Sequence, residues 1–330
     1  MTTPLRQYQA HLVSIIIPVY NRAQMLQEAV ESALKQNYKP IEIIIIDDGS
    51  SDETSELAHS LAKRHSNVSC IRTENQGPAL ARQTGLEQAR GAYIQYLDSD
   101  DLLDPNKLVQ QVAELQATTS ADVVYCRQAL ADSNGKIIED NWMRTGEQHK
   151  TMFPAMLAGR IWGTPAPLYR HTLLDKAGAW KKLSNLEDWE YDCRLAIYST
   201  GLAYVDQSLV LVRRHAGEHY GNIEPQDHHK ISDRAEAFIL IAGHAKTASI
   251  NHNSLEYRKF VRSCFHVARQ TAHAGLIDQA RALFTLCMAH RNASWTQQIE
   301  YRLFSLLSGL IGWQRMARIS SKIDAIRGDN

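Results

Sequence analysis

The hydrophobic positions along the chain follow two alternating patterns. Stretches that are largely apolar and rich in β-branched residues are typical of strands buried on both faces of a parallel sheet, and they occupy 13–20, 41–46, 68–73 and 92–97. Stretches with apolar residues at helical spacing lie between them, at 23–36, 54–64 and 78–90. Because strand and helix alternate to about residue 127, the pattern predicts an open, mostly parallel, Rossmann-like α/β sheet flanked by helices and joined by right-handed crossovers.

The pattern changes twice further along the chain. From about 140 to 219 the periodicity weakens, and prolines and tryptophans lie between short segments, so we expect a mixed region there. From about 227 to the end the spacing is helical almost throughout. We therefore expect an α/β domain over 1–225, with its two halves at about 13–127 and 128–225, followed by a helical C-terminal region over 226–330.

Composition excludes several classes of protein. Lys plus Arg and Asp plus Glu both total 36, and a net charge of +0 gives no overall attraction to nucleic acid. The five cysteines are far apart and include no CxxC pair, which argues against a zinc ribbon or a disulfide framework and fits a reducing compartment. The chain starts without a signal-type apolar segment, and no apolar run reaches the roughly 18 residues that span a bilayer. We therefore expect a cytoplasmic protein.

Acidic residues follow two of the predicted strands. Asp47 and Asp48 end the strand 41–46, while Asp98 and Asp100 follow 92–97. Ligands of such sheets bind at the carboxyl ends of the strands, which form one edge. Two carboxylates separated by one residue can hold a divalent cation, and Mg²⁺ commonly binds through one or two carboxylates plus substrate phosphates. This pattern predicts a cation and phosphate site.

Simpler interpretations remain open for the same acidic residues. The stretch 98–104 can be a solvated turn that ends in a helix cap, with Asp104 before a proline at the first helical position. Asp47 and Asp48 can form only a turn, in which Gly49 supplies a positive φ. A dinucleotide site is disfavoured, because no GxGxxG motif follows the first strand.

With these residues in place, the chain resembles the family-2 inverting glycosyltransferases of the GT-A fold, which use nucleotide-diphosphate sugars. The resemblance covers about 13–220. The motifs that carry it, in order, are Ser14-Ile15-Ile16-Ile17-Pro18-Val19-Tyr20-Asn21, Ile45-Ile46-Asp47-Asp48-Gly49-Ser50-Ser51-Asp52, Asn75-Gln76-Gly77 with Ala81-Arg82, Gly91 to Asp101, Glu187-Asp188-Trp189 and Arg213-Arg214-His215.

The resemblance implies a nucleotide-binding half at about 13–127 and an acceptor-binding half at 128–225. Its nucleotide- and substrate-binding residues are implied to be Pro18, Tyr20, Asn21, Asp47, Asp48, Asn75, Gly77, Arg82, Asp98, Ser99, Trp162, Glu187, Trp189 and Arg214. Within that set, Pro18 and Tyr20 would flank the nucleobase, and Asp48 would bind the uracil or ribose side.

The resemblance also implies a metal centre. Asp98-Ser99-Asp100 matches the DxD motif, in which Asp100 would coordinate Mg²⁺ or Mn²⁺ directly and Asp98 would reach the metal through water or contact the ribose. His215 would be a further metal ligand, although a single histidine among 14 is more often a surface or core residue. Arg214 would contact phosphate, while one of the neighbouring pair Arg213 and Arg214 is expected to face away.

Asp188 matches the catalytic base of the family. Inverting transfer requires a carboxylate that removes the proton of the acceptor hydroxyl as its oxygen attacks the anomeric carbon. Alternatively, Glu187 and Asp188 only favour the positive end of a helix dipole; Glu187 could also bind the acceptor or orient Asp188. Trp162 and Trp189 could stack on a sugar ring, or they could pack in the core.

The C-terminal stretch 303–313 is apolar but too short to span a membrane. The cationic residues around it are Arg302, Arg315, Arg318 and Lys322. They would suit an interfacial helix on anionic lipid, which a lipid-linked acceptor would make useful. The alternative is a helix buried against the enzyme or against a sister subunit.

The sequence thus predicts a metal-dependent, inverting glycosyltransferase of the hexosyltransferase type, with a UDP-sugar favoured as donor. The acceptor would be a glycan or a lipid-linked molecule in surface polysaccharide or glycoconjugate synthesis, and the enzyme could lie peripherally at the inner face of the plasma membrane. One alternative is a nucleotidyltransferase, which would be expected to carry an early Gly-rich phosphate loop. The other is a non-catalytic binding or assembly protein that works through its helical region.

Overall fold

The computed structural model describes residues 7–132, 135–214, 227–290 and 294–327, with side chains described as far as 320. Within these residues the chain forms two compact units. The sheet unit takes in 1–152, 160–182 and 198–217, and the helical unit takes in 153–159, 183–197 and 218–330. Two short segments from the middle of the chain therefore join the C-terminal helices.

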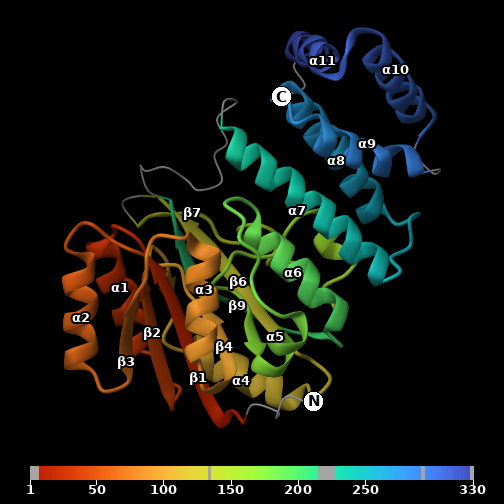
Figure 1. The fold of residues 1–330 in the computed structure, drawn as a ribbon. Helices are drawn as coiled ribbons and strands as arrows, with labels where there is room; N and C mark the ends of the chain where they lie inside the picture. The colour runs from red at the N-terminus through yellow and green to blue at the C-terminus, as the bar shows by residue number, and fades with distance from the viewer. Residues whose placement is uncertain (1–6, 133–134, 215–226, 291–293, 328–330) are drawn as a thin grey trace, which may run out of the picture. The chain divides into compact units, whose positions relative to one another are not determined.

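The sheet unit is built on a nine-stranded sheet with the strand order β3-β2-β1-β4-β8-β6-β9-β5, and β7 pairs with β6 (Figure 1). The strands are β1 (Gln9–Val19), β2 (Ile41–Asp47), β3 (Val68–Arg72), β4 (Gly91–Tyr96), β5 (Leu102–Leu103), β6 (Val123–Ala131), β7 (Ile137–Glu139), β8 (Leu168–Arg170) and β9 (Leu202–Arg213). The first four strands are parallel to one another. The α/β fold predicted from the sequence is confirmed.

The second half of the sheet is mixed rather than parallel. The short strand β8 lies between β4 and β6 and is antiparallel to both. Further along, β6 pairs in parallel with β9, whereas β5 and β7 form antiparallel pairs with β9 and β6. Three-residue strands such as β8 carry too little periodic signal to be placed from the sequence, which explains why this half was expected only as a mixed region.

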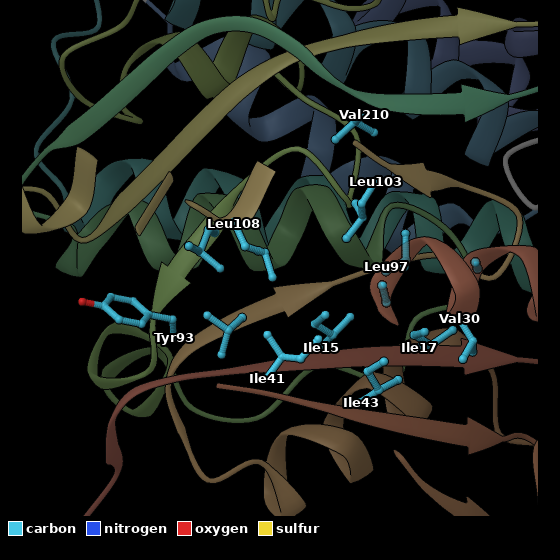
Figure 2. Close-up of a cluster of buried hydrophobic side chains, with 14 of the residues drawn as sticks. Ile15, Ile17, Val30, Ile41, Ile43, Tyr93, Leu97, Leu103, Leu108 and Val210 are labelled. Atoms are coloured by element: carbon cyan, nitrogen blue, oxygen red, sulfur yellow. The ribbon is translucent and has the colours of Figure 1, made fainter. Parts of the chain in front are cut away.

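Helices cover the sheet because alternate residues of its strands face opposite sides. The helices of this unit are α1 (Ala23–Leu34), α2 (Thr54–Arg64), α3 (Pro78–Gln88), α4 (Lys107–Ala117) and α5 (His171–Ala177). Ile15 and Ile17 belong to a buried cluster that includes apolar residues of α1, α2 and α4 (Figure 2). Ile16 instead meets α3, where a Cβ on Gly85 would lie 2.4 Å from its Cγ2. Glycine is therefore required for this close helix–strand approach.

The helical unit packs around aromatic rings. It contains the 3₁₀ turn η1 (Ala155–Ala158) and the helices α6 (Glu187–Tyr198), α7 (His228–Thr247), α8 (Leu255–His273), α9 (Ile277–Ala289), α10 (Trp295–Ile311) and α11 (Trp313–Arg327). Trp189 of α6 lies edge-on to Phe238 of α7 and Phe260 of α8, with ring centroids 5.2 Å and 6.2 Å away. Within the described ranges, no helix is both long enough and apolar enough to cross a membrane.

Candidate active site

The two acidic loops lie on either side of the end of β1. In the parallel ladder Val19 of β1 is paired with Asp47 of β2, and the Asp48 N–H donates to the Val19 carbonyl at 2.9 Å. On the other side of β1, the Leu97 N–H donates to the Ile16 carbonyl at 3.0 Å, directly before the loop that starts at Asp98. The loops therefore share one edge of the sheet, as expected from the strand pattern.

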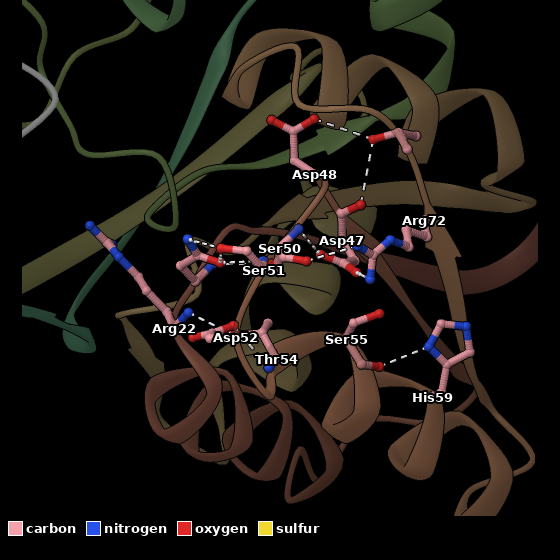
Figure 3. A network of polar contacts seen from close by, with 12 residues as sticks. Arg22, Asp47, Asp48, Ser50, Ser51, Asp52, Thr54, Ser55, His59 and Arg72 are labelled. Carbon is pink, nitrogen blue, oxygen red and sulfur yellow. Dashed lines mark hydrogen bonds and ion pairs between the residues drawn. The ribbon is translucent and has the colours of Figure 1, made fainter.

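Asp48 holds the loop between β3 and α3. Its carboxylate accepts hydrogen bonds from the N–H groups of Gln76 (3.0 Å) and Gly77 (2.8 Å) and from the Thr73 hydroxyl (3.2 Å), and only 4% of the residue is exposed. Figure 3 shows the Asp48 side chain beside the turn that carries Asp47 and Ser50. The β3–α3 loop packs closely against the turn after β2: a Cβ on Gly49, where φ is +78°, would lie 2.8 Å from the backbone nitrogen of Asn75. Asp48 therefore shapes the wall of the site.

Asp47 is an anchor for its own turn. It is fully buried, accepts a hydrogen bond from the Ser50 N–H at 2.9 Å and lies 3.3 Å from the Arg72 guanidinium. Arg72 also donates to the Ser50 carbonyl at 2.8 Å, which closes the arrangement seen in Figure 3. In this structure Asp47 stabilises a turn, which is one of the two interpretations that the sequence allowed. Its ionic partner, Arg72, was not identified from the sequence.

The loop after β1 is tied to the turn after β2. Asn21 has a positive φ of 50°, and its side-chain oxygen accepts the Ser51 N–H at 2.7 Å while its backbone N–H donates to the Ser50 hydroxyl at 3.0 Å. Pro18 is buried in the strand, but Tyr20 is 42% exposed. Of Pro18 and Tyr20, the two residues expected to flank a base, Tyr20 offers an open aromatic surface. Asn21 fixes the loop that carries it.

Asp98 is paired with a buried arginine. The Arg82 guanidinium of α3 donates to an Asp98 oxygen at 2.8 Å, and Arg82 itself is only 5% exposed. Its guanidinium carbon lies 5.2 Å from the ring centroid of Trp180, whose indole N–H donates to the Tyr96 hydroxyl at 3.1 Å. Trp180 therefore positions Arg82, a role that no local pattern in the sequence revealed.

Two further arginines meet the rest of the acidic loop. Arg22 contacts the Asp100 carboxylate at 2.5 Å. Arg213, at the end of β9, uses its guanidinium to bind the Asp100 carbonyl and Glu28, and its N–H donates to an Asp101 oxygen at 3.1 Å. Of the neighbouring pair at 213 and 214, the structure thus turns the first toward the acidic loop.

Negative charge remains concentrated in this loop. Burial raises the pKa of Asp101 well above its usual value, and the charges of Asp100 and Asp98 raise it further, against the opposing effect of Arg213. Carboxylate oxygens on alternate residues are the donor type that suits Mg²⁺ or Mn²⁺, with phosphates completing the shell. The donor set of Asp98 and Asp100 therefore fits a divalent cation that binds together with a diphosphate.

The described residues contain no group of three or more His, Cys, Asp or Glu side chains arranged to hold a metal on their own. The third predicted ligand, His215, lies outside the described residues.

Asp188 is the second residue of helix α6 in the helical unit. Leu186, just before the helix, has a left-handed φ of 59°, a strained conformation for a residue other than glycine. Glu187 and Asp188 are both half-buried, and an Asp188 oxygen accepts the Trp189 N–H at 2.7 Å. The carboxylate thus sits on the first turn of a rigid helix, where the helix dipole favours its charge.

A buried ionic network holds the N-terminal half of α6 in place. Glu190 is fully buried and accepts hydrogen bonds from His244 at 2.8 Å and from Arg194 at 3.0 Å. Burial pushes the pKa of Glu190 upward, but these hydrogen bonds outweigh it and hold the pKa below its usual value. The network fixes the helix that carries Asp188, and it was not anticipated from the sequence.

Both candidate tryptophans are engaged in packing. Trp162 is fully buried, with its ring centroid 5.0 Å from that of Tyr125. Trp189 is 8% exposed, and its indole N–H donates to the Met156 carbonyl at 2.7 Å. In this structure neither ring presents a free face to a sugar, so the packing alternative describes them both.

The remaining predicted residues are dispersed around the edge of the sheet. Asn75 is exposed, and Gly77 caps α3 with a φ of 92°. Ser99 is 5% exposed within the acidic loop. Arg214 is exposed, and its N–H donates to the Ala131 carbonyl at 2.8 Å.

Together, the parallel half-sheet and the acidic loops after β2 and β4 define an α/β protein of the GT-A class. The fold is similar to that of S. aureus TarS residues 1–349 in complex with UDP, with a TM-score of 0.63 and 18% identity over 91% of each chain. It is also similar to the mannosyltransferase PcManGT of Pyrobaculum calidifontis in complex with GDP-Man and Mn²⁺, with a TM-score of 0.52 and 15% identity over 97% of this chain and 88% of that one.

Residues 14–173 match the model described as Glycosyl transferase family 2, so this part of the chain is similar to the glycosyltransferases of that family. An uncharacterized glycosyltransferase of Rickettsia prowazekii is 43% identical over 122 residues, which are 37% of this chain and 37% of that protein. The uncharacterized glycosyltransferase EpsJ of Bacillus subtilis is 32% identical over 179 residues, half of each protein. The matches thus span between about a third and half of the length of these relatives.

Proposed function

We propose that the protein is an inverting, metal-dependent glycosyltransferase that moves a sugar from a nucleotide-diphosphate donor, with a UDP-sugar favoured. The observation that carries this proposal is the pair of acidic loops beside β1, one holding the β3–α3 loop through Asp48 and the other presenting Asp98 and Asp100. The UDP bound to TarS and the GDP-Man with Mn²⁺ bound to PcManGT are consistent with such a site. The acceptor would be a glycan or a lipid-linked molecule of surface polysaccharide or glycoconjugate synthesis.

In this proposal, Asp98 and Asp100 hold a divalent cation, which when bound stabilises negative charge on the departing diphosphate as a Lewis acid. Asp48 keeps the β3–α3 loop in place against the nucleoside. Arg22 and Arg82 balance the acidic loop and orient its carboxylates for the donor.

Asp188 serves as the general base on the acceptor side. It removes the proton of the acceptor hydroxyl as the hydroxyl oxygen attacks the anomeric carbon. Because the attack comes from the side opposite the departing diphosphate, the configuration at that carbon is inverted. The first turn of α6 holds the carboxylate on a rigid element, as a positioned base requires.

Calorimetric titration of UDP in the presence and absence of Mn²⁺ tests the donor site. We expect Asp100→Asn to weaken Mn²⁺-dependent binding by about 100-fold or more, because losing even an outer partner of a metal ligand commonly costs about 10–100-fold. Asp104→Asn is the matched control: Asp104 lies in the same loop, and its side chain accepts the Asn106 N–H at 2.8 Å, a bond that asparagine can also make. Equal affinities for the two variants would remove Asp100 from the metal site.

Product analysis distinguishes the proposed reaction from its rivals. A glycosyltransferase releases a nucleoside diphosphate and forms a glycoside with inverted anomeric configuration, which NMR detects. Release of pyrophosphate would instead identify a nucleotidyltransferase. Tight nucleotide binding without turnover for any acceptor would favour a binding or assembly protein.

A further inference from the structure

Helix α10 has two apolar faces, and only one of them is packed. Tyr301 and Phe304 are buried, with ring centroids 4.7 Å from Phe265 of α8 and 5.6 Å from Phe284 of α9, respectively. The opposite face carries five large apolar residues that recur every three or four positions. They are Trp295 (76% exposed), Ile299 (36%), Leu303 (54%), Leu306 (63%) and Leu310 (72%).

These five residues, which we call the α10 stripe, form a continuous surface. At 1.5 Å per residue the stripe is about 22 Å long. Leu307 and Ile311, each 38% exposed, widen it along one side. Soluble proteins rarely expose an aligned apolar face of this extent unless something binds to it. Trp295, the most exposed of these side chains, stands at one end, and tryptophan is enriched where an apolar medium meets water.

The charges in the stretch of chain that carries the α10 stripe, 294–320, are almost all positive. Within 294–320 the only acidic residue is Glu300, and it already pairs with Arg262 of α8. Arg302, Arg315 and Arg318 are exposed in the same stretch. A second copy of the chain on this face would bring like charges together without carboxylates in this stretch to offset them. The charge pattern instead complements an anionic surface.

A cation-lined pocket lies near the C-terminal end of the stripe. It has a volume of about 510 Å³, and Arg281, Ser308, Trp313 and Arg315 are among the residues that line it. The Arg281 guanidinium lies 6.0 Å from the ring centroid of Trp313. The Ser308 hydroxyl is buried and has no hydrogen-bond partner among the residues that the structure describes. The pocket thus offers cationic groups and an unused hydroxyl to an anion.

We propose that the α10 stripe and this pocket bind the surface of an anionic phospholipid bilayer. The helix would lie in the plane of the interface with the stripe among the upper acyl chains, and Arg281 and Arg315 would contact a headgroup phosphate. Binding would be peripheral. The proposal rests on the helical unit alone and does not depend on the proposed glycosyl transfer.

Vesicle flotation of the full chain tests the apolar part of the proposal. We expect binding to vesicles of phosphatidylcholine mixed with phosphatidylglycerol, and a loss of about tenfold or more in the Leu303→Gln/Leu306→Gln variant, because each leucine loses its transfer into the apolar layer. Leu255→Gln is the matched control, since Leu255 is 54% exposed, like Leu303, but lies at the start of α8. All three replaced leucines are exposed, so circular dichroism should show folded proteins.

The charged part needs its own variant. We expect Arg281→Gln/Arg315→Gln to lose about fivefold per arginine on the anionic vesicles and to leave binding to pure phosphatidylcholine unchanged. Lys259→Gln, which removes an exposed cation of α8, should have no such effect. Absence of wild-type binding to anionic vesicles, or equal binding by all variants, would overturn the proposal. So would light scattering that shows a stable dimer that Leu303→Gln/Leu306→Gln converts to a monomer, which would make the stripe a contact between copies.

Discussion

Replacing Asp48 with asparagine would separate the structural role of its carboxylate from a binding role. The two carboxylate oxygens accept the N–H groups of Gln76 and Gly77 and the Thr73 hydroxyl. Asparagine has one acceptor oxygen, so in either orientation its amide nitrogen faces a donor. A hydrogen bond to a charged group contributes about 1.5–3 kcal/mol, and the residue is 4% exposed, so water cannot replace the lost bond.

We therefore expect Asp48→Asn to lower the free energy of unfolding by about 1.5–3 kcal/mol. For a domain of this size that corresponds to a fall in Tm of about 3–12 °C. Differential scanning calorimetry measures it. The control is Asp52→Asn, because Asp52 is exposed and its side chain accepts the Thr54 N–H at 3.0 Å, an Asx-turn bond that asparagine makes equally well.

Binding of UDP would be measured at a temperature where both variants are folded. If the carboxylate also contacts the nucleoside, Asp48→Asn loses affinity there while Asp52→Asn does not. A Tm for Asp48→Asn equal to that of Asp52→Asn would refute the argument that the carboxylate holds the loop. Unchanged UDP affinity together with a lowered Tm would leave Asp48 only its structural role.

Three other predictions follow from the same contacts. Asp188→Asn should bind UDP normally but lose transfer by about 10²–10⁴-fold, the usual contribution of a general base, and near-normal turnover would exclude it from that role. Gly85→Ala should destabilise the protein by about 1–3 kcal/mol in urea denaturation because its Cβ would collide with Ile16, whereas Gly243→Ala, with open space around it, should stabilise by about 1 kcal/mol. Folding lowers the pKa of Glu190, so its ionised carboxylate contributes to the free energy of unfolding above about pH 4.3, and this contribution is lost as the pH falls through the folded pKa. On acidification, the free energy of unfolding of the wild type, measured by urea denaturation, should therefore fall more steeply than that of Glu190→Gln.

The strand and loop skeleton of the site could be predicted from the sequence because its signals are local. The apolar runs place β1, β2 and β4, and parallel strands bring their carboxyl ends to one edge. The ionic partners could not be placed, since Arg72, Arg82 and Arg213 reach their carboxylates through contacts that depend on which way each side chain points in the finished fold. Neighbouring residues of a strand point to opposite faces of the sheet. The sequence alone therefore does not decide whether Arg213 or Arg214 faces the acidic loop, because that depends on which strands pair with β9.

Aromatic residues show the same limit more clearly. Trp162 and Trp189 carry the same local signal whether they line a pocket or fill a core. Their burial is decided by residues far away in the sequence: Trp189, for example, packs against Phe238 and Phe260. Trp180 positions Arg82 from almost a hundred residues away, and that distance in sequence hid its role.

The interleaving of the helical unit has a consequence for engineering and for evolution. Its core joins η1 and α6, which come from the middle of the chain, to α7 and α8 through Trp189, Phe238 and Phe260. Ser184 is likewise tied to Asp233 by a hydrogen bond of 2.7 Å from its N–H. The C-terminal helices are therefore not an interchangeable module: a chimera or truncation cut near residue 225 would strip the aromatic partners from the helix that bears Asp188, and recombination that keeps a working enzyme must exchange these segments together.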